Sequence, residues 1–448
     1  MKKLIETLKN IYKIEDLRSR IGITLFFILI YRLGSFVVLP GLDPALLGEL
    51  KAQTKDGLLG LLDMFSGGAF SNASVFALGI MPYISASIVI QLLTIAVPYF
   101  QRLQKEGESG RKRMNQITRY LTVIILIFQG PAFLTNLHMT LGNTPGAFVM
   151  SGRMFDISST IIMLAGSMFV LWIGEKITDK GIGNGISLII MIGIIARLPG
   201  AAVQEFISRL EEQSGGGLVL LLIEIVVLFV VFMLVILLVQ GTRRIPVQYA
   251  KRIVGNKQYG GVRQYIPLKV NAAGVMPIIF AQAIMFVPIT LASLGGESMT
   301  GFATAFAYGG FWYNFTMFLM VIAFTYFYTA ITVNPVQMAE DMKKNGGFIP
   351  GVKPGKKTAE FLDTVMSRIT LPGSIFLGIV TILPAFAMIV GVNASFAQFF
   401  GGTSLLILIG VVLDTLQQIE SHLLMRHYDG LMKSGRIKGR AGGATSAI

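Results

Sequence analysis

Ten long apolar segments dominate the sequence and leave few folds open to it. Each is close to the roughly 20 residues that a helix needs to cross the hydrocarbon core of a bilayer. Only 14% of the residues are charged, and nearly all of these lie between the segments, whereas soluble domains carry about 25%. We therefore predict an all-α polytopic membrane protein with ten transmembrane helices. The segments span approximately 21–39, 75–97, 117–137, 155–174, 183–200, 217–239, 272–293, 312–334, 371–391 and 402–420.

Basic residues are concentrated on one side of these segments. The N-terminus, every second loop from 98–116 onward and the C-terminal tail, with the adjoining helix ends, hold 32 of the 38 Lys and Arg residues. Because positive charge is retained in the cytoplasm, both termini are predicted to be cytoplasmic. Residues 1–20 are charged and amphipathic, so we expect them to lie at the membrane interface. Residues 421–448 form the cytoplasmic tail.

The ten segments divide into two groups of five near Ser214. Five is an odd number, so two similar halves would insert with opposite topology, and inverted repeats of this kind build a pathway at their interface. We therefore expect two pseudo-symmetric halves, at 21–213 and 214–420, around a central pore. No clear sequence repeat is visible, and the symmetry follows from the topology.

Two of the cytoplasmic loops are long and basic. The 241–269 loop has 29 residues, of which seven are basic and none is acidic. Its Gly-Asn and Gly-Gly pairs lie between short β-prone runs and predict a protruding hairpin. The 335–370 loop carries six basic residues and the turn sequence FIPGVKPG. Positive loops can serve topology alone, but an acid-free loop of this length favours docking onto an acidic or polyanionic partner.

The sequence MFSGGAFSNAS, which begins at Met64, is too polar to face lipid. Non-helical backbone at membrane depth persists only where it is buried in protein or lines a wet cavity. We therefore expect residues 61–74 to enter the protein from the extracytoplasmic side as a short re-entrant helix. The spans at 183–200 and 272–293 begin in a similar way, with GIGNGIS and NAAGVMP.

Isoleucines at helical spacing follow two of these Gly-rich segments, MFSGGAFSNAS and GIGNGIS. Ile80 and Ile84 are four residues apart, as are Ile186 and Ile190, so each pair shares one helical face. Such pairs are common in membrane helices, and the small residues before them would also serve close helix packing.

Ionisable residues within the spans are few. Ion-coupled transporters need such groups near the bilayer midplane. Arg32 can snorkel outward, Glu224 is about two turns from a span end, and Asp414 and Glu420 lie toward the cytoplasmic end. The spans contain no Ser–His or paired-Asp arrangement and the chain has no phosphate-binding loop, so we expect no enzyme, no metal and no cofactor. A secondary transporter with inverted repeats and a membrane scaffold are the alternatives to a channel.

Several long motifs resemble the SecY family of protein-conducting channels. They are MFSGG, ALGIMPYISASIVIQLL, KEGESGRKR, GIGNGIS, PLKVNAAGVMP and FGGTSLLI, and the likeness covers nearly the whole chain in order. The resemblance implies an hourglass channel in the bacterial plasma membrane, through which unfolded secretory chains cross and from which transmembrane segments leave sideways. It implies the partners SecE, SecG, the SecA motor ATPase, the ribosome and nascent chains.

The resemblance also assigns residues to four functional sets. The pore ring comprises Ile80, Ile84, Ile186, Ile190, Ile279 and Ile407. The plug comprises Phe65, Ser66, Gly67, Gly68, Ala69, Phe70, Ser71 and Asn72. The lateral gate places Ser85, Ile88 and Gln91 opposite Gln282, Phe286 and Val287. The docking surface for SecA and the ribosome comprises Lys251, Arg252, Lys257, Lys353, Lys356 and Lys357.

Two loop positions depart from the family pattern. Lys353 stands before Pro354-Gly355, where relatives usually have arginine, and lysine lacks the planar bidentate fork of a guanidinium. Asn256 and Lys257 stand where relatives often have paired arginines. Contacts with SecA or ribosomal RNA through Lys353 are therefore expected to differ in detail.

Overall fold

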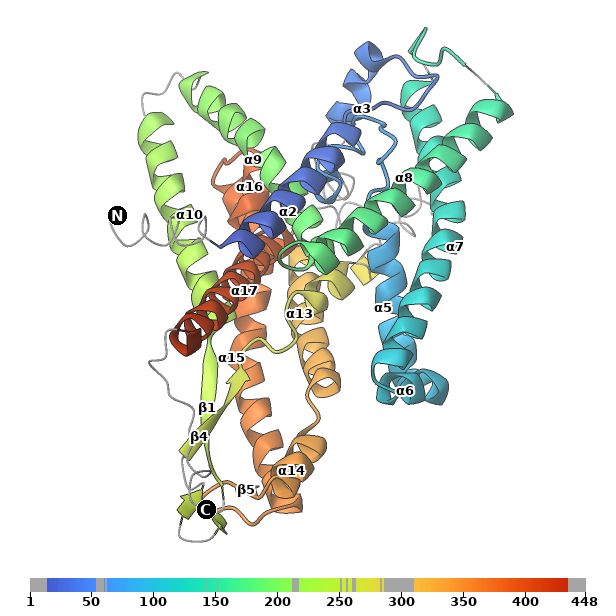
Figure 1. The fold of residues 1–448 in the computed structure, drawn as a ribbon. Coiled ribbons are helices and arrows are strands. Elements are labelled where there is room, and N and C mark those ends of the chain that lie inside the picture. The colour runs from blue at the N-terminus through green and yellow to red at the C-terminus, as the bar shows by residue number, and fades with distance from the viewer. Residues whose placement is uncertain are drawn as a thin grey trace.

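The computed structural model describes residues 14–53, 60, 63–142, 144–150, 152–211, 217–249, 252–254, 257–259, 263–282, 284–285 and 310–433. Helices occupy nine of the ten predicted spans in these ranges (Figure 1). They are α2 (Glu15–Gly34), α5 (Met81–Ala96), α7 (Glu108–Leu141), α8 (Arg153–Lys180), α9 (Gly185–Glu211), α10 (Gly217–Gln240), α13 (Phe311–Thr332), α15 (Lys356–Ile389) and α17 (Gly402–Lys433). The predicted span at 272–293 is helical at 276–282 and 284–285, and its remainder lies outside the described residues.

Seven helices in the described part of the chain are long and apolar enough to cross a membrane. An eighth span results when α5 and α6 (Pro98–Lys105) are counted together, although the chain bends by 101° between them. The bend occurs at Val97, whose extended backbone is the conformation that a following proline favours. The chain is a multi-pass helical membrane protein, as the sequence predicts.

The helices form two groups in the order of the sequence. In the first group α5 packs on α7, α7 on α8, and α8 on both α9 and α2; in the second, α13 packs on α15, and α17 contacts α15 and α10. The two groups meet mainly at α9, which contacts α10, α17 and the short helix α16 (Ala394–Ala397). A relative movement of the two groups would therefore displace α9.

Short elements connect these helices. They are η1 (Pro44–Leu46), α3 (Gly48–Gln53), α14 (Pro335–Lys344) and η3 (Gln398–Phe400). Asn334 caps α14, because its side chain accepts hydrogen bonds from the amides of Val336 and Gln337.

The two basic loops form one folded body. Strands β1 (Thr242–Tyr249) and β4 (Arg263–Lys269) pair antiparallel from Thr242↔Lys269 to Gln248↔Arg263, which confirms the predicted hairpin. Strands β2 (Arg252–Val254) and β3 (Lys257–Tyr259) pair farther along it. The second loop, which includes α14, adds β5 (Gly347–Phe348) to the free edge of β1, and both loops lie at the lower end of the view in Figure 1. Ile245 and Val247 of the hairpin share a buried core with Met342 and Leu362.

The prediction of a re-entrant helix at 61–74 was largely wrong. Residues 63–65 are helical, residues 66–73 form turns, and residues 61 and 62 lie outside the described part of the chain. The next span was predicted from residue 75, but residues 75–80 are also turns or irregular and α5 begins at Met81. Glycines with positive φ occur throughout this stretch, at Gly67, Gly68 and Gly79, and each interrupts helical geometry.

Candidate pore, plug and gate

Residues 63–74, here called the plug segment, lie inside the protein. Asp63, Ala69 and Ser74 are fully buried, and the other residues are buried or half-buried. Buried backbone outside a helix needs other hydrogen-bond partners, and the short polar side chains of the segment supply them. Asp63 Oδ1 accepts from the amide of Ser71 at 2.7 Å, and Ser66 Oγ accepts from the amide of Phe70 at 3.1 Å. The polar composition thus stabilises a compact turn structure away from lipid.

Gly67 lets the plug segment approach α9 closely. Its φ of 65° lies in the left-handed region, and a Cβ at this position would lie 2.8 Å from the Cα of Gly193. Two glycines therefore face each other where the segment meets the helix, and a larger residue at Gly67 would force them apart.

Side chains from α2 and α9 hold the plug segment in place. Arg197 of α9 forms an ion pair with Asp63 and donates a hydrogen bond from Nη2 to Ser71 Oγ at 3.1 Å. Arg32 of α2 donates from Nη1 to the carbonyl of Gly67 at 2.8 Å. Its neighbour Tyr31 donates from its hydroxyl to the carbonyl of Ser66 at 3.0 Å.

Sequence reasoning missed these plug contacts. Arg32 was expected to snorkel outward, but its guanidinium instead reaches the plug segment. The sequence predicted no role for Arg197 or Asp63. The available signal was the position of each arginine beside a long apolar run, where an ionisable residue usually has a functional partner.

Five of the six predicted ring isoleucines belong to one apolar cluster. Ile80, Ile190 and Ile407 are buried in it, and Ile84 and Ile186 pack against it. They come from the start of α5, from α9 and from α17. The sixth, Ile279, is half-buried in the helix at 276–282 and is not part of this cluster.

The plug segment packs into the same apolar cluster. Met64, Phe65 and Ala69 are buried members of it, together with the ring residues of both helix groups. The cluster therefore joins the plug segment to the junction of the two groups. Apolar side chains fill the space between them.

The predicted gate residues are only partly within the described chain. Ser85, Ile88 and Gln91 lie half-buried on α5, and Gln282 lies half-buried on the opposite group, whereas Phe286 and Val287 lie outside the described residues. Gln91 accepts a hydrogen bond from the hydroxyl of Tyr328 on α13. Tyr328 was not predicted as a gate residue.

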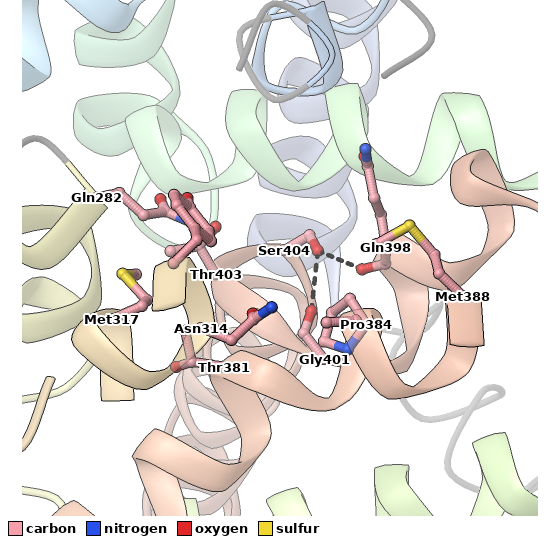
Figure 2. A pocket seen from close by; sticks show the side chains of 13 residues that line it. Gln282, Asn314, Met317, Thr381, Pro384, Met388, Gln398, Gly401, Thr403 and Ser404 are labelled. Atoms are coloured by element: carbon pink, nitrogen blue, oxygen red, sulfur yellow. Dashed lines mark hydrogen bonds between the residues drawn. The ribbon is translucent and has the colours of Figure 1, made fainter. Parts of the chain in front are cut away.

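A small cavity lined by both polar and apolar side chains lies beside Gln282 (Figure 2). It has a volume of about 40 Å³, and Asn314, Thr381 and Thr403 contribute to its lining. The Oγ1 atom of Thr403 is buried without a hydrogen-bond partner in the described part of the chain. Because a single water needs roughly 10–15 Å³, the cavity has room for water beside this hydroxyl.

A second buried polar cluster lies at the junction of α9 and α10. Arg209 pairs with Glu205 at 2.9 Å and with Glu224 at 2.5 Å, and it donates to the carbonyl of Gly391 at 2.8 Å. Glu205 also accepts from the amide of Asn393 at 2.8 Å. Glu224, a transporter candidate from the sequence, is thus held in an ion pair that ties the two helix groups together.

The predicted docking lysines of the second loop are accessible. Lys353, Lys356 and Lys357 are exposed before and within the first turn of α15. A hydrogen bond from Lys357 Nζ to Glu360 Oε2, at 2.8 Å, raises the pKa of Lys357 and lowers the pKa of Glu360. Of the hairpin positions, Arg252 lies in β2 and Lys257 in β3, and Lys251 lies outside the described residues.

A multi-pass helical bundle with a buried segment of turns packed into an apolar cluster between its two helix groups is the architecture of a membrane channel. A model of the SecY family matches residues 74–416. The chain is 41% identical over 445 residues to the protein translocase subunit SecY of Thermotoga maritima, covering 97% of this chain and 99% of that protein. It is 42% identical over 434 residues to the protein translocase subunit SecY of Vibrio cholerae, covering 95% and 96%. The chain belongs to the SecY family.

Solved structures show the same fold at lower sequence identity. A structure described as that of a protein conducting channel aligns with a TM-score of 0.57 and 17% identity, over 93% of this chain and 94% of that chain. Sec61 in the canine ribosome-channel complex from the endoplasmic reticulum aligns with a TM-score of 0.53 and 16% identity, over the same shares.

Proposed function

We propose that this chain is the channel subunit of a protein translocase in the bacterial plasma membrane. It passes unfolded secretory polypeptides across the membrane and releases transmembrane segments sideways into the lipid. The observation that carries the proposal is the apolar cluster that contains both the plug segment and five of the ring isoleucines. Relatives over nearly the full length are named protein translocase subunits, which supports the same function.

The ring isoleucines act as the seal of the resting channel. A narrow apolar constriction dewets and so blocks ions. Branched aliphatic side chains offer no fixed charge to hold a passing chain, and they yield around side chains of different size. Ile80, Ile84, Ile186, Ile190 and Ile407 supply this seal from three helices. Ile279 lies outside their cluster in this structure, and we propose that it joins the ring from the span at 272–293.

The plug segment closes the extracytoplasmic side and moves aside during transport. Its turns are stabilised by hydrogen bonds within the segment, so it is able to move as a unit. In the described part of the chain, the helix side chains that make polar contacts to it are those of Tyr31, Arg32 and Arg197. Such contacts are reversible, as a seal that opens in each transport cycle requires.

Lateral release takes place between α5 and the span at 272–293. On the α9 side the two helix groups share extensive packing and the buried Arg209 cluster. On the α5 side, among the described residues, a hydrogen bond from Tyr328 to Gln91 links the two groups. We infer that α9 and α10 act as the hinge and that the channel opens on the opposite side.

The folded body of the two basic loops receives the cytoplasmic partners. Both termini are cytoplasmic in this proposal, and SecE and SecG accompany the chain in the membrane. SecA or a ribosome docks on Lys251, Arg252, Lys257, Lys353, Lys356 and Lys357. Two of the similar structures are ribosome-bound channels, which is consistent with this use of the surface.

Two competing functions have less support. A secondary transporter would need an accessible carboxylate near the midplane, but Glu224 is paired with Arg209 and Asp414 is hydrogen-bonded to Gln418 near the end of the span. A pure scaffold would not need a segment of turns buried against an apolar ring.

Reconstitution tests the proposal directly. The chain is purified with a SecE-type subunit, placed in vesicles, and supplied with SecA, ATP and an unfolded secretory precursor. Precursor that becomes resistant to external protease, only when ATP and SecA are present, is the expected result. Saturable uptake of a small solute without precursor translocation would contradict the channel assignment.

A further inference from the structure

In the described part of the chain, one ion pair joins the plug segment to a transmembrane helix, between Asp63 and Arg197. Asp63 is fully buried, and both of its carboxylate oxygens are engaged. Oδ1 accepts from the amide of Ser71 at 2.7 Å, and Oδ2 faces the guanidinium of Arg197. The same guanidinium donates to Ser71 Oγ at 3.1 Å. Arg197 thus holds both ends of the turn that Asp63 closes.

Burial makes this pair much more sensitive to change than a surface ion pair. A buried carboxylate is tolerated only with a charged or hydrogen-bonding partner, and loss of that partner leaves an uncompensated charge. Exposed pairs, by contrast, contribute little to stability. The position of the plug segment therefore depends on whether Arg197 stays within reach of Asp63.

Asp63 is shielded from solvent, whereas its partner Arg197 is partly accessible to it. Asp63 has no exposed surface, whereas the Arg197 side chain is 30% exposed. Arg197, Ser71, Gln204 and Gln398 line a cavity of about 330 Å³ that borders the plug segment. Water in this cavity is able to solvate Arg197 once the pair separates, which lowers the cost of breaking it.

Arg197 also lies on α9, the helix through which the first group mainly contacts the second group. This helix packs on α10, α16 and α17 of the second group. Tyr31 and Arg32, by contrast, lie on α2 and bond to backbone carbonyls of Ser66 and Gly67. The main contacts of α2 are with α8 and α9 of its own group, so a movement at the α9–α10 hinge acts on Arg197 more directly than on Tyr31 and Arg32.

We propose that the Asp63–Arg197 ion pair is the latch that keeps the plug segment closed and that a change in the tilt of α9 at the hinge during opening releases it. The inference rests on the proposed channel function and concerns the regulation of its seal. The latch couples the hinge at α9 to the plug, so that the plug is freed when the two helix groups move apart.

Charge-neutral variants of the latch provide the test. Asp63→Asn and Arg197→Gln retain size and polarity but remove one charge each, and the double variant removes both. The readout is the ion conductance of the resting complex, chain plus SecE-type subunit, in planar bilayers without SecA, ribosome or precursor. We expect each single variant to raise the resting conductance at least about tenfold. The double variant should leak no more than the worse single variant, because the two residues act as a pair.

A second readout follows the plug itself. The natural chain has no cysteine, so Asn72→Cys introduces a single thiol in the plug segment. Labelling of this thiol by a membrane-impermeant maleimide should be faster in the Asp63→Asn background than in the natural one. The matched control is Asp156→Asn, which makes the same change in a half-exposed carboxylate that pairs with His138 at 2.9 Å. It should alter neither conductance nor labelling.

The outcomes separate the latch from the proposed function. If the natural complex translocates precursor but the single variants keep the resting conductance and labelling rate of the natural chain, the latch is wrong and the channel assignment stands. The latch is also wrong if the two single effects multiply in the double variant. If no variant and no plug deletion ever conducts ions or precursor, the channel assignment itself fails.

Discussion

The hydroxyl of Tyr328 on α13 donates a hydrogen bond to the side-chain carbonyl of Gln91 on α5, 237 positions away in the sequence. Tyr328 also packs against Phe280, with ring centroids 6.1 Å apart. This small cluster joins the two helix groups on the side away from the α9–α10 junction. It therefore lies at the lateral opening that we propose above.

Removal of this hydrogen bond should make the gate easier to open. Tyr328→Phe keeps the aromatic packing and deletes only the hydroxyl, so a typical net hydrogen-bond contribution of about 0.5–1.5 kcal/mol would be lost. We expect marginally hydrophobic test segments to be released into the membrane about two- to tenfold more often. A glycosylation or protease-protection assay of segment insertion measures this ratio. Tyr326→Phe, also on α13, is the matched control, and an equal change in both variants would show that the contact with Gln91 is not responsible.

A covalent tether across the gate should stop export. The chain has no cysteine, so Ser85→Cys with Val287→Cys places the only two thiols on opposite sides of the proposed opening. Oxidation should block secretion of a precursor, and reduction should restore it. Each single-cysteine variant should be unaffected by oxidant. Full secretion with the crosslink demonstrably formed would exclude lateral opening between these two helices.

The sequence predicts the helices much better than the plug. Long apolar runs identified helices at nine spans within the described chain, because hydrophobic length alone determines which segments cross a membrane. The turns at 66–73 depend instead on Asp63, on Ser66 and on two arginines more than 30 and 120 positions distant. The contacts of these arginines with the turns are tertiary, so no local sequence pattern predicts them. The same holds for β5, which joins β1 from a different loop.

The buried Arg209 cluster should be a strong determinant of stability. Arg209→Met leaves Glu205 and Glu224 without their counter-charge, and loss of one partner from a buried ion pair costs about 3–5 kcal/mol. We expect a clear fall in the thermal unfolding midpoint of the detergent-solubilised complex. Adding Glu205→Gln and Glu224→Gln to the same variant should recover part of the loss, since no uncompensated charge then remains. If the single and triple variants unfold at the same temperature as the natural chain, the cluster is not what fixes α9 to α10.

Reversal of charge on the loop body should weaken partner docking without affecting the pore. Lys353, Lys356 and Lys357 are exposed, and their replacement by Glu turns attraction for a polyanion into repulsion. Ribosome affinity should fall, and the affinity that remains should depend less steeply on salt, because fewer counterions are released on binding. Binding titrations at several ionic strengths give both quantities. Conductance of the chain without a partner should be unchanged, and an unchanged ribosome affinity would mean that these charges serve topology only.

Polar substitution of the ring should let ions leak through the resting channel. Ile80 and Ile190 are buried in the cluster that also holds Met64 and Phe65 of the plug segment. Asparagine at both positions would give water hydrogen-bonding partners inside the constriction, so the constriction would no longer dewet. We expect measurable ion conductance in planar bilayers, rising further when residues 65–72 are also deleted. Val at both positions keeps the site apolar and branched, and this control should leak far less than the asparagine variant. Equal leakage from the valine and asparagine variants would show that packing, and not apolarity, makes the seal. If neither variant leaks, the barrier to ions lies elsewhere in the chain.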